Sequence, residues 1–290
     1  MVELGILLPA ILNGLTMGAI YALVALGLTL IYGVLHIINF AHGALLMVAL
    51  YGAFFLNRFL GVDPYLASLV IVPALFIIGY SLQRGIIARA GHGNDENILL
   101  VTLGIAIVLE NLAVFFWGAD TLTVETPYSF KTVDLGVADI AVPKAVGFGA
   151  TVVIVAALSL LMTQTDLGRA IRAIAKERRG AQLVGIDVDR IFAISFGIGT
   201  ACVGAAACLL LPFFYVNPRV GQTFVLIAFT VVVLGGMGSF VGALLGGLII
   251  GVTESLGGLF LGESLGQVTI FVIFIGILLF RPTGLLGQKA

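Results

Sequence analysis

Long apolar runs recur along this 290-residue chain, and most of them approach the roughly 20 residues that a helix needs to cross a membrane. They occupy residues 5–34, 37–57, 65–82, 97–117, 144–163, 191–211, 222–236, 241–260 and 267–280. The mean hydropathy of +1.19, with 60% hydrophobic and 10% charged residues, excludes a water-soluble domain. We therefore predict an all-α, polytopic transmembrane bundle of about eight or nine spans, some of them interrupted, forming a single domain over 1–290.

Several other classes of protein are disfavoured by the composition. The net charge of −1 argues against nucleic-acid binding. Cys202 and Cys208 lie six residues apart in one apolar run, so a helix separates them by about 9 Å along its axis, too far for a disulfide. With three histidines in the chain, we expect neither a metal site nor a catalytic triad. No GxxxxGK[ST] phosphate loop occurs, so we expect no ATPase site and no enzymatic activity.

The charges of the loops predict the orientation of the chain in the membrane. Residues 83–96 carry two arginines, whereas residues 118–143 carry one lysine, Lys131, among four acids. Because cytoplasmic loops are enriched in Lys and Arg, the first segment is expected inside and the second outside. Counting spans then places the N-terminus outside and the tail, 281–290, inside. Alternating and β-branched residues in the outer segment, 118–143, favour a short hairpin. This hairpin would be either a surface for an external partner or a lid.

One charged segment, 166–190, interrupts the apolar pattern and holds six of the 14 Lys and Arg residues. This content places it on the cytoplasmic side, and its periodicity predicts an amphipathic helix that Asp166 caps and Gly185 ends. Leu167, Ile171 and Ile174 fall on one face. Arg169, Arg172, Lys176 and Arg179 fall on the other. Such a helix suits the docking of a partner protein, and a solvated loop without a partner is the alternative.

Two apolar segments contain interruptions that are followed by similar residues. Gly43-Ala44-Leu45-Leu46 follows HIINFAH (36–42), and Gly242-Ala243-Leu244-Leu245 follows LGGMGSF (234–240). Paired interruptions of this kind indicate a transporter's central site. We therefore regard Asn39, His42, Gly235, Gly236 and Gly238 as candidates for the solute pathway or its gate, and expect the two breaks to approach each other. The alternative is that both breaks only turn the chain between helices.

Small residues and rare polar residues mark other positions within the spans. GxxxG spacing at Gly14–Gly18, Gly242–Gly246 and Gly247–Gly251 predicts close helix packing. The polar residues within the spans are Asn13, Asn39, His42, Glu110, Asn111 and Glu254. Because an acid in hydrocarbon is costly, Glu110 is a further pathway candidate that could meet the ammonium group of a solute or a partner helix. A structural acid is the alternative for Glu110 and, more strongly, for Glu254.

Four stretches form an ordered set of motifs along the chain: NGLTMGAIYALVALGLTLIYGVLHIINFAHG (13–43), GRAIRAIAKERRGAQLVGI (168–186), VLGGMGSFVGALLGGLIIGVTESL (233–256) and FRPTGLLG (280–287). In this order they resemble the smaller permease subunit of branched-chain amino acid ABC transporters. The chain departs from the family at Ala44, where an acid is frequent, and at Leu50-Tyr51-Gly52, where the family often has GAY. Relatives on this scaffold also carry urea, short amides and other carboxylates, so the solute stays open.

The resemblance implies a multi-pass subunit of the bacterial inner membrane. Its implied partners are a second permease in a heterodimer, two cytoplasmic ATPases that bind the ATP, an external solute-binding protein and membrane lipid. Segment 168–186 aligns with the family's coupling helix. A function from another class, a self-sufficient secondary transporter or channel with Glu110 and Glu254 as ion sites, is the alternative to an ATP-driven importer.

Overall fold

The computed structural model describes residues 4–90, 95–134, 136, 139–280 and 284–285. The helices that precede the hairpin are α1 (Leu4–Leu35), α2 (Ala41–Leu60), α3 (Pro64–Leu82), the π-helix η1 (Gln83–Ile87), α4 (Ala88–Ala90) and α5 (Asp95–Trp117). The strands β1 (Thr132–Asp134) and β2 (Asp139–Ala141) follow. The later helices are α6 (Val142–Gln164), α7 (Asp166–Lys176), α8 (Arg178–Leu183), α9 (Val188–Leu210), α10 (Val220–Gly235), α11 (Phe240–Leu261) and α12 (Glu263–Phe280).

The predicted apolar runs all form helices. Within the described residues, seven helical segments are long and apolar enough to cross a membrane, and α10 and α12 are shorter apolar helices. Two boundaries were clearly wrong. The run predicted at 37–57 is helical only from Ala41, where α2 begins. The third span, predicted to end at 82, continues without a break through η1 and α4 to Ala90. Arg84 lies within this continuation, where its guanidinium donates to the Tyr80 hydroxyl at 2.7 Å.

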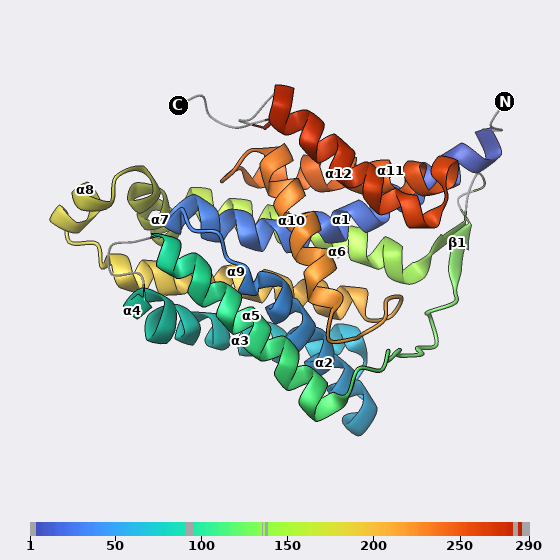
Figure 1. Ribbon diagram of the computed structural model, residues 1–290, viewed down its shortest axis with the longest axis horizontal. Helices are drawn as coiled ribbons and strands as arrows, with labels where there is room; N and C mark the ends of the chain where they lie inside the picture. Colours follow the sequence, from blue (N-terminus) through green and yellow to red (C-terminus); the bar gives the residue numbers. More distant parts are fainter. Residues whose placement is uncertain (1–3, 91–94, 135, 137–138, 281–283, 286–290) are drawn as a thin grey trace.

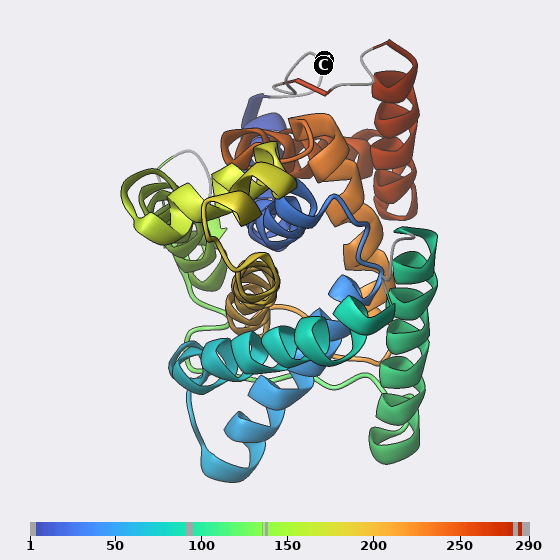
Figure 2. The same cartoon turned by 90° about the vertical axis from the view of Figure 1, so that its left-hand side faces the viewer.

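Helix α1 is the central column of the bundle. Figure 2 shows it surrounded by α6, α9, α10 and α11, with α5 and α12 at one edge of the molecule. The predicted GxxxG packing is confirmed where α1 crosses α11. A Cβ on Gly14 would lie 2.7 Å from the Gly251 carbonyl oxygen, and one on Gly18 would lie 2.6 Å from that of Gly247. Only glycine permits this approach, which brings the two backbones into contact.

Helix α10 is held at both ends by glycine contacts with the helices that follow the two interruptions. At its start, a Cβ on Gly221 would lie 2.3 Å from the Gly43 carbonyl oxygen of α2. At its end, one on Gly235 would lie 2.3 Å from the Gly242 carbonyl oxygen of α11. The two similar sequence stretches thus hold the two ends of one short helix.

The segments of predicted opposite sidedness lie at opposite ends of the molecule. In Figure 1, α7, α8 and α4 gather at one end, and the N-terminus and the hairpin of β1 lie at the other. The predicted hairpin is confirmed: β1 and β2 pair antiparallel, with Val133 opposite Ile140. The arginine-bearing tail at 281–283 and the terminal 286–290 lie outside the described residues. Cys202 and Cys208 are both free thiols in the core.

Side-chain contacts tie the outer segment to the bundle. Tyr128 donates to Asp63 at 2.7 Å, and the same carboxylate caps α3 by accepting from the Tyr65 amide at 2.9 Å. Burial, with a further contribution from Asp63, raises the pKa of Tyr128 well above its usual value of 10, so its phenol stays protonated and remains a donor. An isolated antiparallel bridge between Leu122 and Val216 joins the outer segment to the segment before α10. The outer segment is therefore anchored at several points.

The contact between Gly221 and Gly43 at the start of α10 is expected to stabilise the bundle. We expect Gly221→Ala to lower the melting temperature of the purified chain because its methyl group would overlap the Gly43 carbonyl, costing about 1–3 kcal/mol. Gly104→Ala on α5 is the matched control, since nothing lies within 4 Å of its added Cβ. Thermal unfolding in detergent measures both variants. Equal melting temperatures would show that the α2–α10 contact does not support the fold.

Candidate functional site

The predicted coupling helix is present, but it is divided and capped differently from the prediction. Thr165, and not Asp166, caps α7: its hydroxyl accepts from the Gly168 amide at 3.1 Å. The helix stops at Glu177, whose backbone is extended. The Glu177 carboxylate then caps the start of α8 by accepting from the Arg179 amide. Asp166 instead pairs with Arg169 on the surface of α7. Gly185 follows α8 with φ of +86°, as expected for a residue that ends a helix.

The apolar face of α7 packs on the chain's own spans. Ile171 and Ile174 are each 3% exposed; Ile171 packs with Leu30 and Val34 of α1 and with Met162 of α6. Arg169, Arg172, Lys176 and Arg179 are exposed, as predicted, although Arg179 belongs to α8. A partner at this end of the molecule would therefore meet the basic face.

The tip after α7 exposes two apolar side chains beside this basic face. Leu183 is 89% exposed and Val184 is 77% exposed, at the end of α8. These two residues were not predicted, because the periodicity of the segment places its apolar contact at Ile171 and Ile174. The Arg178 guanidinium lies 5.1 Å from the Phe192 ring centroid, which attaches α8 to α9.

The first interruption carries the chain back into the bundle. After α1 ends, residues 36–40 are non-helical and His36 has a φ of +56°. His42, in the first turn of α2, donates from Nε2 to the Val24 carbonyl at 2.9 Å. Asn39 is fully buried, and its side-chain oxygen accepts from the Ala41 amide at the start of α2 at 3.0 Å. Both predicted residues thus lie at the start of α2, beside the middle of α1.

The second interruption rests on the end of α1. Gly236 and Gly238 have φ values of +94° and +90°, which L-residues rarely adopt. A Cβ on Gly33 would lie 3.1 Å from the Cα of Gly238. A cavity of about 140 Å³ separates this contact from α7, and both Ile171 and Arg172 line it. The coupling helix and the second break therefore share one pocket.

The two predicted pathway groups occupy different depths. Val24, which binds His42, precedes Gly33 by nine residues, or about 14 Å along the helix. The second break is near the α7 end of the bundle. Asn39 and His42 lie deeper, where α2 and α10 start side by side at Gly43 and Gly221. Helices that begin inside a membrane bundle are typical of transporters.

Glu110 lies on the partly exposed side of α5 and is paired with α10. Its carboxylate accepts from the Gln222 side-chain amide at 2.8 Å. Asn111, the next residue, donates to the Ile107 carbonyl of its own helix at 2.8 Å. Around them α5 exposes large apolar side chains, including Ile107, Phe115 and Phe116. A polar group set in an exposed apolar surface requires cover by protein or water within a membrane.

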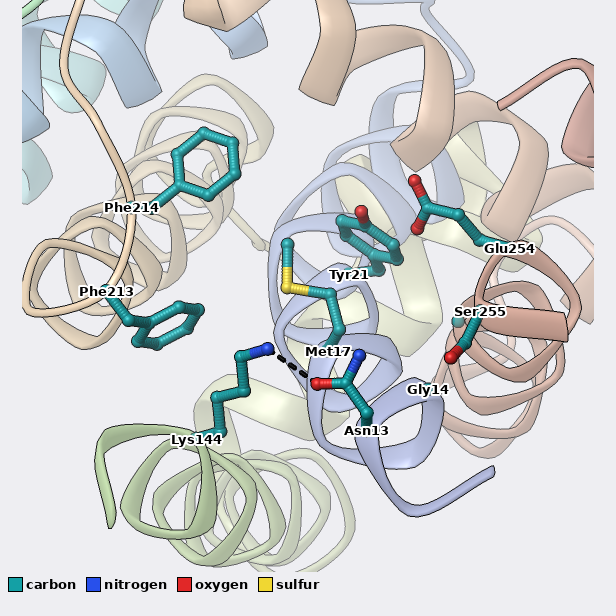
Figure 3. A pocket seen from close by; sticks show the side chains of 10 residues that line it. Asn13, Gly14, Met17, Tyr21, Lys144, Phe213, Phe214, Glu254 and Ser255 are labelled. Carbon is teal, nitrogen blue, oxygen red and sulfur yellow. Dashed lines mark hydrogen bonds between the residues drawn. The ribbon is translucent and has the colours of Figure 1, made fainter. Parts of the chain in front are cut away.

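A polar pocket lies between α1, α6, α11 and the segment before α10. Figure 3 shows Asn13 and Lys144 on one side of it and Tyr21 and Glu254 on the other. Asn13 and Glu254 stand out in the sequence as separate polar residues within spans. Lys144 does not stand out, because it lies at the start of a span, where lysine is commonplace. Among the residues described, no group of three or more His, Cys, Asp or Glu side chains could hold a metal ion.

Comparison with known proteins identifies the family. The model of the branched-chain amino acid transport system / permease component family matches residues 10–280. The chain is 34% identical to the high-affinity branched-chain amino acid transport system permease protein BraD of Pseudomonas aeruginosa, covering 97% of this chain and 96% of BraD. It is 33% identical to LivH of Escherichia coli K12, again over 97% and 96%. A probable LivH of Methanocaldococcus jannaschii is 30% identical over 91% and 88%.

A solved structure supports the fold. PsaBC from Streptococcus pneumoniae in complex with Fab superposes with a TM-score of 0.51 at 16% identity, covering 94% of this chain and 92% of that one. At this identity the likeness concerns the fold alone. With the long apolar helices, these matches show a multi-pass membrane protein. The chain belongs to the permease component family of branched-chain amino acid transport systems.

Proposed function

We propose that this chain is a permease subunit of an ATP-driven importer of branched-chain amino acids or a related small polar solute. The structure of α7 supports this proposal most directly. Its apolar face is buried on α1 and α6, and its basic face is exposed beside the Leu183–Val184 tip. Two cytoplasmic ATPases would dock on this surface and bind the ATP. The chain itself would hold no cofactor and act as a non-enzymatic transport subunit.

The geometry supports a route from the docking surface to the solute region. Ile171 packs on the last turns of α1, and Gly238 lies against Gly33 in those turns. Movement of α7 would therefore displace the end of α1 and the second break together. Because α10 ends at that break and starts beside Gly43, its shift would reach the level of Asn39 and His42. We propose that these residues border the pathway and that Gly235, Gly236 and Gly238 form the hinge.

The remaining surfaces support proposals for the other partners. The Glu110–Gln222 pair and the exposed apolar residues of α5 would be covered by a second permease in a heterodimer. The hairpin end would receive an external solute-binding protein, and the apolar spans would contact lipid. The sources of the bacterial relatives support placement in a bacterial inner membrane.

The buried face of α7 yields a prediction for coupling. Ile171→Asp would place an unpaired carboxylate among Leu30, Val34 and Met162, costing about 2–4 kcal/mol. We expect α7 to leave the bundle, uptake to fall about 30-fold or more, and membrane insertion to persist. Ile171→Leu, which conserves volume, is the matched control. Solute uptake and solute-stimulated ATP hydrolysis of the reconstituted complex measure the effect, and normal values in Ile171→Asp would remove α7 from coupling.

A self-sufficient secondary transporter is the second candidate function. It is favoured by two acids within spans, Glu110 paired with Gln222 and Glu254 facing a pocket. For an ATP-driven subunit we expect the purified chain alone, in liposomes, to show no solute flux under a proton or sodium gradient. Gradient-driven flux that Glu110→Gln or Glu254→Gln abolishes would contradict the importer and establish the alternative.

A further inference from the structure

The pocket between α1, α6 and α11 has the chemistry of a ligand site. Its volume is about 280 Å³, and Lys144 reaches it from the first turn of α6. Glu254 enters from α11, and Tyr21 enters from α1 between them (Figure 3). Met17, Phe213 and Phe214 supply an apolar wall.

Neither Lys144 nor Glu254 forms a salt bridge among the residues that the structure describes. The Lys144 ammonium donates to the Asn13 side-chain oxygen at 2.5 Å and lies 5.8 Å from the Phe213 ring centroid. The Glu254 carboxylate faces the side of Tyr21 (Figure 3). One cation and one anion therefore border one cavity without neutralising each other.

A ligand with charges of both signs would satisfy both groups. We propose that this pocket binds an α-amino acid as a zwitterion, with its carboxylate on Lys144 and Asn13 and its ammonium on Glu254 and the Tyr21 hydroxyl. Its apolar side chain contacts Met17 and the Phe213 ring. This assignment rests on the proposed function and adds a solute site to it. A simple anion would match the charge of Lys144 alone, and a simple cation would match the charge of Glu254 alone, whereas a zwitterion matches both.

An aromatic layer separates this pocket from the centre of the bundle. The Phe224 ring lies edge-on to Tyr21 at 5.8 Å and to Phe214 at 5.3 Å between centroids. Phe224 is 2% exposed and follows Gly221, which contacts Gly43, by one helical turn. A bound amino acid would therefore rest one aromatic layer from the start of α2, and a shift of α10 would move that layer.

Direct binding tests the assignment. The complex with its ATPases, in phosphatidylcholine nanodiscs without the solute-binding protein, is titrated with radiolabelled L-leucine. Competitors are 4-methylpentanoate, which lacks the ammonium group, and isoamylamine, which lacks the carboxylate. We expect Lys144→Met and Glu254→Gln each to weaken leucine binding about tenfold or more. Lys144→Met should leave isoamylamine affinity unchanged, and Glu254→Gln should leave 4-methylpentanoate affinity unchanged. Lys131→Met and Glu125→Gln, exposed in the outer segment, are the matched controls.

The outcomes separate this site from the proposed function. ATPase co-purification and ATP hydrolysis, measured on the same samples, report on the importer. A wild-type complex that hydrolyses ATP but binds no leucine, or that binds it equally in both variants, would overturn the site alone. Retention of phosphatidylethanolamine by the wild type and its loss from both variants, seen by mass spectrometry after purification from native membrane, would assign the pocket to a lipid headgroup and also overturn it.

Discussion

The contact of backbone with backbone at glycine is the constraint on which this bundle depends. In lipid, apolar side chains gain little by leaving one apolar environment for another, so helices associate through close packing and hydrogen bonds. Gly14 and Gly18 bring α1 against α11, and Gly27 meets Gly199 of α9. The same device fixes both ends of α10. A short helix held at two points by backbone contacts moves as a unit, which suits it to transmit displacement.

The arrangement places three regions in one connected series. The apolar face of α7 rests on the end of α1, where Gly238 also packs, and the basic face of α7 is exposed. From that break, α10 leads to Gly221 and to Phe224 beside the pocket of Lys144 and Glu254. An importer driven by cytoplasmic ATPases needs a mechanical link of this kind between the docking surface and the solute path. In the proposed importer, these packed elements, each with few alternative positions, would supply that link.

Local patterns in the sequence predicted the local structure. The apolar runs, the outer hairpin, the two interruptions and the two faces of α7 depend on composition and periodicity, and each is present in the structure. Thr165 replaced Asp166 as the cap because either residue can accept from the first turn, and backbone geometry decides between them. The pocket could not be predicted, because Asn13, Lys144 and Glu254 are brought together only by the packing of three distant helices. The position of the start of α2, beside Val24 in the middle of α1, likewise depends on tertiary contacts.

The accessibility of the α8 tip tests the central claim, that the α7–α8 surface receives the ATPases. Leu183→Cys is prepared in a background of Cys202→Ala and Cys208→Ala, and its reaction with a water-soluble maleimide is timed with and without the ATPase subunits. Because Leu183 is 89% exposed in the chain alone, rapid labelling is expected there, and docking should slow it about tenfold or more. Glu125→Cys, in the outer segment, should react at one rate in both samples. Equal labelling of Leu183→Cys in the free chain and in the assembled complex would contradict the account.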